Sequence, residues 1–286
     1  MLDYGFKTML LLSDESSRDL IGSKGIELIY KVFPDGEQYV RLPVSITGEH
    51  VIYVTRAYPN QDRSLVRSLL VINALKDLGA SRVGLFMPYM PYARQDKRFL
   101  DGEAISIDYI IKSLRNAGLD ELFVVDIHKP EVLDRNGLGI NLEPFQVYSS
   151  LLSTLRNPLV LSPDIGSLWR AKKLAQLIGA DFDYLEKTRD RFTGQVSVKP
   201  KDISAANRDV VIIDDIIATG GTIINGINAL KGEARTIRVI AAHCLLLNDA
   251  DQKIINAGAA EIICSNSILT KYSRADVSQL LLTVIK

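Results

Sequence analysis

The sequence is poor in cysteine and histidine, with two and three residues respectively among 286. It contains no C-x-x-C pair, which excludes a zinc-cluster protein and a fold built on a disulfide framework. Cys244 and Cys264 each end an apolar run, which favours buried free thiols in a reducing compartment. A bridge between these two residues is the alternative. A chain of this length buries enough surface to fold without cross-links.

An excess of charge and long apolar runs are also missing. The 34 basic residues balance the 34 acidic ones, which argues against a general nucleic-acid binder and a membrane-surface protein. No apolar run approaches the ~20 residues that span a bilayer, and the first residues, which include Asp3, do not resemble a signal peptide. We therefore expect a cytoplasmic protein that acts on small molecules, with no nucleic-acid or membrane partner.

One junction recurs along the chain, where an amphipathic stretch ends at glycine and a short apolar run follows. It occurs at Gly79, Gly118, Gly179, Gly232 and Gly258. Glycine after a helix supplies the left-handed conformation that other residues resist. The pattern therefore predicts helices that alternate with strands.

The strand candidates are apolar on both faces, as in mostly parallel sheets that are covered by helices. They are residues 83–86, 122–125, 159–161 and 210–213. Helical spacing predicts helices over 65–78, 145–155 and 169–178. We predict an α/β protein of two domains, 1–143 and 144–286, each a mostly parallel sheet flanked by helices. The last helix is expected to pack back on the N-terminal domain.

The segment 210–222 carries the strongest chemical signal. A buried strand candidate runs into Asp214 and Asp215, then into a glycine-containing loop, and a helix begins near Thr222. Glycines and a helix amino terminus present backbone N–H groups to a phosphate, and Thr219 and Thr222 add hydroxyl donors. The two carboxylates suit sugar hydroxyls or a cation. Together these groups indicate a ribose 5-phosphate site at the carboxyl end of a sheet. A tight turn with an exposed acid pair is the alternative.

This segment resembles the 5-phosphoribosyl 1-diphosphate binding motif of the phosphoribosyltransferase superfamily. The motif occurs both in enzymes that make this compound and in enzymes that consume it. The choice between them therefore depends on the other segments of the chain.

Two segments of the N-terminal half suit a nucleotide. Residues 33–37, Phe-Pro-Asp-Gly-Glu, form a predicted turn whose ring can stack on a base and whose carboxylates can accept from an amino group. Residues 94–98 follow a strand candidate and hold three bases in five positions, which indicates a loop that faces an anion. A solvated surface segment is the alternative for each.

Two more polar segments follow strand candidates. His128 and Asp164 stand where they can hold a divalent cation, and Mg²⁺ characteristically uses few protein ligands together with substrate phosphates. A structural histidine is the alternative for His128. Residues 187–201 contain five bases and one acid, with Gly194 and Pro200 among them. This composition predicts a mobile loop that closes over phosphates, and a solvated connection is the alternative.

Taken in order, these segments resemble the ribose-phosphate diphosphokinase family, also called phosphoribosyl-pyrophosphate synthetases. The likeness runs from about residue 20 to the carboxyl terminus, and the length is most similar to the short archaeal form. It implies two domains of the type I phosphoribosyltransferase kind and a homodimer or larger homo-oligomer. Ala218 departs from the family pattern, which often has Asp or another polar residue there, and the basic stretch differs beyond Arg189 from the longer bacterial form.

The resemblance also implies roles for the matching residues. Lys187 and Arg189 would be catalytic, and His128 and Asp164 would bind Mg²⁺. The implied ATP-binding residues are Phe33, Asp35, Gly36, Glu37, Arg94, Gln95 and Asp96. The implied ribose 5-phosphate-binding residues are Arg189, Asp214, Asp215, Ala218, Thr219, Gly220, Gly221 and Thr222.

The implied reaction transfers the diphosphoryl group of ATP to the anomeric hydroxyl of ribose 5-phosphate and leaves AMP. The chain has no G-x-x-x-x-G-K-[ST] segment, so a P-loop is absent. A phosphoribosyltransferase that consumes the diphosphate compound is one alternative, although it has no use for the ATP-type segments. A non-catalytic regulatory relative is another, although it would be expected to lose Lys187, Arg189 or His128.

Overall fold

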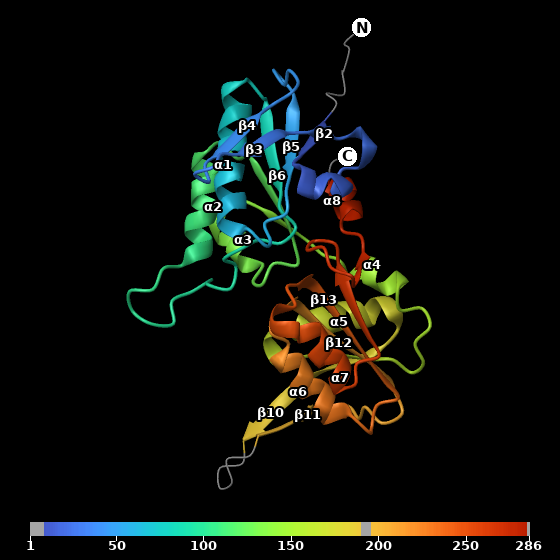
Figure 1. Cartoon of the computed structure of the whole chain (residues 1–286). Coiled ribbons are helices and arrows are strands. Elements are labelled where there is room, and N and C mark those ends of the chain that lie inside the picture. The colour runs from blue at the N-terminus through green and yellow to red at the C-terminus, as the bar shows by residue number, and fades with distance from the viewer. Residues whose placement is uncertain (1–8, 190–195, 285–286) are drawn as a thin grey trace. The chain divides into compact units, whose positions relative to one another are not determined.

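The computed structural model of the chain describes residues 9–189 and 196–284, apart from the side chains of residues 24, 187–189 and 196–197. The chain divides into two compact units, Met1–Leu142 with Val277–Lys286, and Glu143–Asp276. Within each unit, parallel strands form a sheet that carries helices (Figure 1). The predicted α/β class with mostly parallel sheets is confirmed.

The described part of the first unit contains a six-stranded parallel sheet in the order β2-β1-β5-β6-β7-β8 and a separate antiparallel hairpin, β3-β4. Its strands are β1 (Leu10–Ser13), β2 (Ile26–Glu27), β3 (Ile29–Val32), β4 (Gln38–Arg41), β5 (His50–Val54), β6 (Arg82–Phe86), β7 (Glu121–Val125) and β8 (Ile140–Leu142). Its helices are the 3-10 helices η1 (Glu15–Leu20) and η2 (Gly22–Lys24), with α1 (Gln61–Asp77), α2 (Ser106–Asn116), α3 (Glu131–Asn136) and α8 (Ser278–Val284).

Helix α8 belongs to the first unit although it comes last in the sequence. Figure 1 shows it beside the blue segment that contains η1. Val277 and Leu281 are buried with Ile52, Phe86 and Phe123 of the sheet in one apolar cluster. The end of the chain therefore completes the core of the unit that the beginning of the chain starts.

The described part of the second unit contains a seven-stranded sheet in the order β11-β10-β9-β12-β13-β14-β15, parallel except for β11. Its strands are β9 (Leu159–Ser162), β10 (Asp181–Arg189), β11 (Val196–Pro200), β12 (Asp209–Ile217), β13 (Thr236–Cys244), β14 (Glu261–Ser265) and β15 (Ser273–Ala275). Its helices are α4 (Phe145–Ser150), α5 (Leu168–Ile178), α6 (Gly221–Leu230) and α7 (Ala250–Ala257), with the 3-10 helices η3 (Ile165–Ser167) and η4 (Leu247–Asp249).

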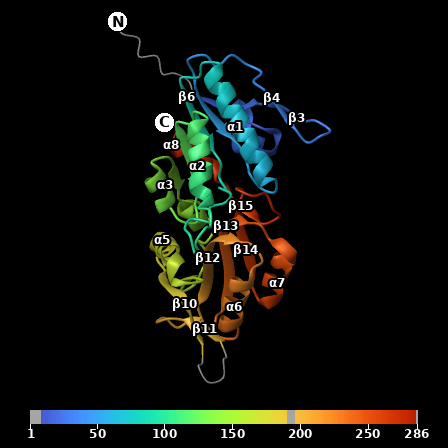
Figure 2. The same cartoon turned by 90° about the vertical axis from the view of Figure 1, so that its left-hand side faces the viewer.

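Helices cover both faces of this sheet. Figure 2 shows α5 on one side of β12 and β13, and α6 with α7 on the other. Ile212 faces the cluster that contains Ile227 and Ile254, whereas Val211 faces the cluster that contains Leu174. Burial on both faces explains why these strands are continuous apolar runs.

The recurrent glycines end helices as expected. Gly79, Gly118, Gly179, Gly232 and Gly258 all have positive φ, between 65° and 126°. The helix expected over 145–155 is shorter and ends at Ser150. The Ser149 and Ser150 hydroxyls donate back to the carbonyls of Gln146 and Val147 at 2.9 and 2.8 Å, a local bond that competes with continued helix.

The prediction of free thiols is wrong, because Cys244 and Cys264 form a disulfide. Strands β13 and β14 are neighbours, and their register places Cys264 opposite Ala241, near the end of β13. The resulting Cα–Cα distance of 6.0 Å lies in the range that a bridge requires. Within the part of the chain that the structure describes, no helix is long and apolar enough to cross a membrane.

Candidate active site

The acid pair of the second unit lies within strand β12, which continues past both carboxylates to Ile217. The strand runs between β9 and β13, and Asp214 stands opposite Ala241 in the register with β13. Asp215 is buried and Asp214 is half-buried. The strand is longer than the sequence predicted, because Ile216 and Ile217 continue its pairing with β13.

The two carboxyl groups have different electrostatic surroundings. The Arg170 guanidinium of α5, itself buried, lies 3.8 Å from Asp215 and compensates its charge. Burial raises the pKa of the Asp214 carboxyl well above its usual range, and the charge of Asp215 adds to this effect. Asp214 is therefore the carboxyl group of the pair that gains most from a bound hydroxyl donor or cation.

The loop after β12 turns sharply into helix α6. Gly220 adopts the left-handed conformation at φ 75°, and a Cβ there would lie 3.1 Å from Ile254 Cδ1. The Ile224 N–H donates to the Gly220 carbonyl at 2.9 Å. The N–H groups of Gly221, Thr222 and Ile223 precede this bond in the first turn of α6. They have no partner within the helix and are available to an anion.

The side chains of this loop add two hydroxyl groups. Thr219 and Thr222 are both exposed, on either side of the glycine pair. Ala218 is half-buried, and its carbonyl accepts from the Leu247 N–H at 2.9 Å. The backbone of the neighbouring segment thus fixes the position of Ala218 in this loop.

Asp164 follows β9 and begins the 3-10 helix η3. Its Oδ1 accepts from the backbone N–H and the hydroxyl of Ser167, each at 3.1 Å. The residue is exposed, so its carboxylate remains accessible while it caps the turn. In the second unit, Asp164 follows β9, and the acid pair lies in the carboxyl-terminal half of the adjacent strand β12.

Of residues 187–201, predicted as a loop, residues 187–189 and 196–200 lie in two paired antiparallel strands. Lys187 pairs with Val198 and Arg189 with Val196, across strands β10 and β11. The pairing extends regular strand structure to Arg189, which composition alone did not indicate. The side chains of Lys187 and Arg189 lie outside the described part of the structure, as do residues 190–195.

In the first unit, residues 33–37 form the tight connection between β3 and β4. The Phe33 N–H donates to the Glu37 carbonyl at 2.8 Å, and the Glu37 N–H donates to Asp35 Oδ1 at 3.0 Å. Gly36 has φ 95°, which this turn requires. The Phe33 ring is 41% exposed, and the Lys31 ammonium lies 4.9 Å from its centre. The predicted turn is present, with its aromatic ring accessible.

The segment that contains Arg94, Gln95 and Asp96 follows β6 as a loop in which Gln95 and Asp96 are half-buried. Gln95 Nε2 donates to the Lys97 carbonyl at 3.0 Å, and the Arg135 guanidinium donates to the Asp96 carbonyl at 2.7 Å. Glu103 closes the loop by accepting from the Phe99 N–H at 2.7 Å, and this bond lowers the pKa of the Glu103 carboxyl. Arg94 is exposed next to the backbone that these hydrogen bonds hold.

His128 follows β7 and is half-buried. The intervening Asp126 has φ 40°, and the Ile127 N–H donates to Asn141 Oδ1 at 2.9 Å. His128 and the segment 94–96 thus follow neighbouring strands, β7 and β6, at the same edge of the first sheet.

The sequence analysis missed Arg170. This arginine is 2% exposed and stacks 4.5 Å from the centre of the Trp169 ring. Its spacing of four residues from Leu174 places it on the buried face of α5, so a charged residue on a predicted apolar stripe was the available signal.

Mg²⁺ fits these donors only as a cation with few protein ligands. Among the described residues, no three His, Cys, Asp or Glu side chains gather in one cluster. Mg²⁺ commonly binds one or two carboxylates and completes its shell with water and substrate phosphates. The accessible Asp164 and the paired carboxylates of β12 are donors of that type.

The comparisons with known proteins agree with this geometry. Residues 15–118 match the N-terminal domain of ribose phosphate pyrophosphokinase, and residues 147–276 match the phosphoribosyl transferase domain. The ribose-phosphate pyrophosphokinase of Sulfurisphaera tokodaii is 38% identical over 92% of each chain, and that of Saccharolobus solfataricus is 40% identical over 89% of each. The crystal structure of phosphoribosylpyrophosphate synthetase from Mycobacterium smegmatis superposes with a TM-score of 0.85 at 26% identity and covers 98% of each chain. The chain is therefore an enzyme of the ribose-phosphate pyrophosphokinase family.

Proposed function

We propose that the chain catalyses Mg²⁺-dependent transfer of the β,γ-diphosphoryl group of ATP to the 1-hydroxyl of ribose 5-phosphate, with 5-phosphoribosyl 1-diphosphate and AMP as products. The observation that carries this proposal is the β12–α6 junction. It combines a buried acid pair with a glycine loop that opens a helix. The names of the similar proteins support the same reaction.

The junction accounts for binding of the sugar phosphate. The 5-phosphate would accept from the N–H groups at the start of α6 and from the hydroxyls of Thr219 and Thr222. The ribose hydroxyls would donate to Asp214 and Asp215. The Arg170 guanidinium lies 3.8 Å from Asp215 and compensates its negative charge. Ala218 contributes its backbone to this loop, while its side chain makes no polar contact.

The first unit would bind the nucleotide. Phe33 offers an exposed ring for stacking on adenine, and Asp35 and Glu37 are acceptors on the same turn. Gly36 permits that turn. Arg94, Gln95 and Asp96 would bind the nucleotide from the loop after β6.

The reaction forms a bond between the sugar 1-oxygen and the β-phosphorus and breaks the bond from that phosphorus to the oxygen of AMP. The hydroxyl proton passes to solvent water as the new bond forms. Positioning of the reactants and stabilisation of charge account for most of the rate acceleration in such transfers. Lys187 and Arg189 would stabilise the charge of the transition state, and Arg189 would also contact the sugar phosphate.

When bound, Mg²⁺ would neutralise charge on the transferred phosphates, and His128 of the first unit and Asp164 of the second are each proposed as a metal ligand. The oligomeric form proposed is a homodimer or larger homo-oligomer. The proposed location is the cytoplasm.

One assay tests the proposal. The protein is incubated with ATP, ribose 5-phosphate and Mg²⁺, and the nucleotide product is separated by chromatography. We expect AMP to form in equal amount with 5-phosphoribosyl 1-diphosphate, and neither to form when ribose 5-phosphate is omitted. Formation of ADP would mean a simple kinase and would contradict the proposal. Consumption of 5-phosphoribosyl 1-diphosphate with a free base would instead favour a phosphoribosyltransferase, and a wholly inactive protein a regulatory relative.

A further inference from the structure

The loop of residues 94–103, which follows β6, contains hydrogen bonds of its own. Glu103 Oε2 accepts from the backbone N–H groups of Phe99 and Leu100, at 2.7 and 3.1 Å. It also accepts from Gln95 Nε2 at 3.3 Å. These bonds fix the internal shape of the loop, because donor and acceptor both belong to it. A loop that binds a ligand must also be held in place on the unit, since ordering it at the moment of binding costs affinity.

Arg135 joins this loop to the helices of the first unit. Its Nη2 donates to the Asp96 carbonyl at 2.7 Å. The same nitrogen donates to Asp108 Oδ1 at 2.7 Å, and Nε donates to that oxygen at 3.0 Å. Arg135 lies in the last turn of α3, and Asp108 lies in the first turn of α2. One guanidinium group therefore connects the loop to two helices.

The Asp108 carboxylate orients the Arg135 guanidinium. Asp108 is half-buried, and its Oδ1 also accepts from Asn136 Nδ2 at 2.8 Å. Asn136 Nδ2 donates in addition to the Val132 carbonyl of α3 at 2.8 Å, so the amide that holds the carboxylate is itself held. A guanidinium is planar and its donors have fixed directions. With Nε and one Nη2 hydrogen on Asp108, the second Nη2 hydrogen remains for the Asp96 carbonyl.

Helix α3 also follows the candidate metal ligand of the first unit. His128 lies two positions before Pro130, the residue that precedes the first residue of α3, Glu131. The helix is only six residues long, and Arg135 lies in its last turn. A single short element thus connects His128 with the loop that contains Asp96.

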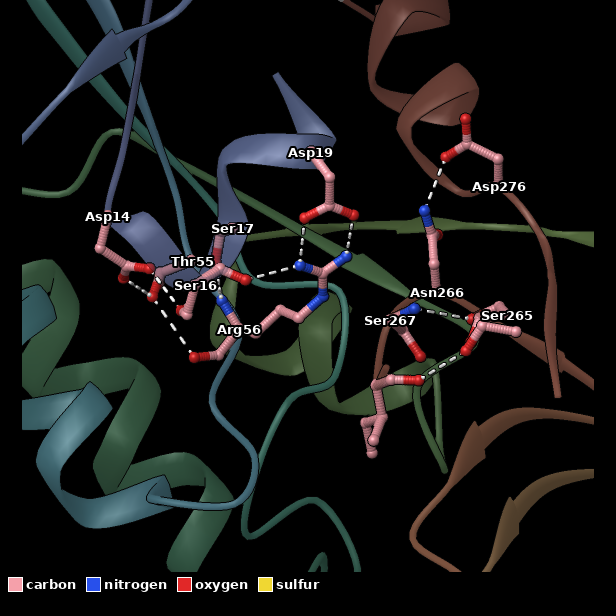
Figure 3. A network of polar contacts seen from close by, with 12 residues as sticks. Asp14, Ser16, Ser17, Asp19, Thr55, Arg56, Ser265, Asn266, Ser267 and Asp276 are labelled. Carbon is pink, nitrogen blue, oxygen red and sulfur yellow. Dashed lines mark hydrogen bonds and ion pairs between the residues drawn. The ribbon is translucent and has the colours of Figure 1, made fainter. Parts of the chain in front are cut away.

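Another arginine of the first unit makes the same kind of bridge in the interior. Arg56 contacts both oxygens of Asp19, at 2.6 and 2.7 Å, and the Ser16 carbonyl at 2.7 Å, as Figure 3 shows. The Arg56 side chain is 4% exposed, whereas that of Arg135 is 41% exposed. Exposed ion pairs contribute little to the stability of a fold. The contacts of Arg135 can therefore be removed with little effect on folding.

We propose that Arg135 is a positioning residue for the nucleotide, which holds the loop that carries Arg94, Gln95 and Asp96 in the arrangement that binds ATP. This inference rests on the proposed function, which assigns ATP to the loop. Without the Arg135 donors the loop would occupy other arrangements as well, and the apparent affinity for ATP would fall by the fraction of molecules that remain competent to bind. The affinity for ribose 5-phosphate should not change, because the β12–α6 junction belongs to the second unit.

Steady-state kinetics and equilibrium binding of ATP with Mg²⁺ test the proposal on the full chain. Arg135→Met keeps a long side chain and removes the donors. We expect the KM and Kd for ATP to rise about fivefold, as for the loss of one net hydrogen bond. Both kcat and the KM for ribose 5-phosphate should remain near wild-type values. Arg135→Lys, which retains a charged donor, should show a smaller rise.

Arg18→Met is the matched control. Arg18 is an arginine of the same unit that pairs with the exposed Glu27 at 2.9 Å, away from the loop. Its loss should leave the affinity for ATP unchanged. If Arg135→Met does not fold, Asp108→Asn tests the same bridge, because it removes the charge that orients the guanidinium. This variant should also raise the Kd for ATP.

Equal affinity for ATP in Arg135→Met and wild type would overturn the proposal. An equal rise in the KM values of both substrates would also overturn it, since this result indicates a general structural role. Binding is measured without turnover, so the two proposals can fail separately. A wild type that binds ATP and forms no AMP contradicts the proposed function, while the affinity of the variant still decides the role of Arg135. A wild type that binds no ATP contradicts both.

Discussion

Asp214 carries a protonation equilibrium that links the candidate site to stability. Its pKa is raised by burial and by Asp215, so the folded chain holds a proton there that the unfolded chain releases above its usual pKa of ~3.9. Stability should therefore fall as the pH rises from about 4 through the raised value. In the folded chain the ionised Asp214 carboxylate lowers stability. A bound hydroxyl donor or cation would stabilise that carboxylate.

The substitution Asp214→Asn tests this linkage. The amide resembles the neutral carboxyl, so we expect the variant to melt at a higher temperature than wild type at pH 7.5. The difference should shrink towards pH 4, where the folded wild-type carboxyl is protonated and the unfolded one is about half protonated. Thermal unfolding at both pH values, without ligands, provides the measurement. A variant that is less stable than wild type at pH 7.5 would contradict the direction given for the Asp214 pKa.

Lys187 is the residue on which the proposed chemistry depends most. Loss of a transition-state charge contact commonly costs about 100-fold in turnover or more, so Lys187→Ala should lower kcat by at least ~100-fold. The measurement is AMP formation at saturating ATP and ribose 5-phosphate. Lys172→Ala, an exposed lysine of α5, is the matched control and should retain activity. Near-normal turnover of Lys187→Ala would remove this residue from the mechanism.

At the scale of elements, the conformation of the β12–α6 loop requires glycine at position 220 more strictly than at position 221. Gly220 has φ 75° and Ile254 lies close to the place of its missing Cβ, whereas Gly221 has open space there. We expect Gly220→Ala to lower stability by about 1–2 kcal/mol and to raise the KM for ribose 5-phosphate. Gly221→Ala should leave the melting temperature unchanged or raise it, because alanine favours the helix. Equal melting temperatures for both variants would contradict this difference.

The disulfide joins two neighbouring strands across a sequence separation of 20 residues. Closing a loop of that length restricts the unfolded chain and stabilises the fold by about 3 kcal/mol. The double variant Cys244→Ala, Cys264→Ala should lose about this much in a denaturant titration. Dithiothreitol should lower the stability of wild type similarly and leave the double variant unaffected. A wild-type protein indifferent to the reductant would show that the bridge does not form.

The local sequence pattern was sufficient to predict most of these elements. It was insufficient where a residue pairs with another that is distant in the sequence. The glycine junctions and the apolar run 210–213 predicted the alternation of helices and strands and the position of the acid pair. The hairpin of β10 and β11 was missed because its pairing, not its composition, makes it regular. The disulfide was missed because it requires β13 and β14 to be neighbours. Arg170 was missed for a related reason, since its partner Asp215 is 45 positions away.

For the whole molecule, the packing of α8 in the first unit is the arrangement with the clearest effect on stability. Leu281 is 1% exposed in the cluster that also contains Val54 and Val125. Removing a buried leucine side chain typically costs about 2–5 kcal/mol, so Leu281→Ala should destabilise the first unit.

Hydrogen exchange can assign this loss to one unit. In Leu281→Ala, amides of β5, β6 and β7 should exchange faster than in wild type, and amides of β12 and β13 should not change. Leu282→Ala is the matched control, because this neighbouring side chain is 57% exposed. Faster exchange confined to β12 and β13 would show that α8 stabilises the second unit instead.

The same arrangement has a consequence during translation. Because α8 follows the second unit in the sequence, a nascent chain has synthesised the whole of Glu143–Asp276 before the residues that cover Ile52 and Phe86 leave the ribosome. The second unit is continuous in sequence and can fold as soon as it emerges. The first unit must wait with part of its apolar surface uncovered, so a ribosome that stalls after the second unit and before α8 leaves a chain prone to aggregation.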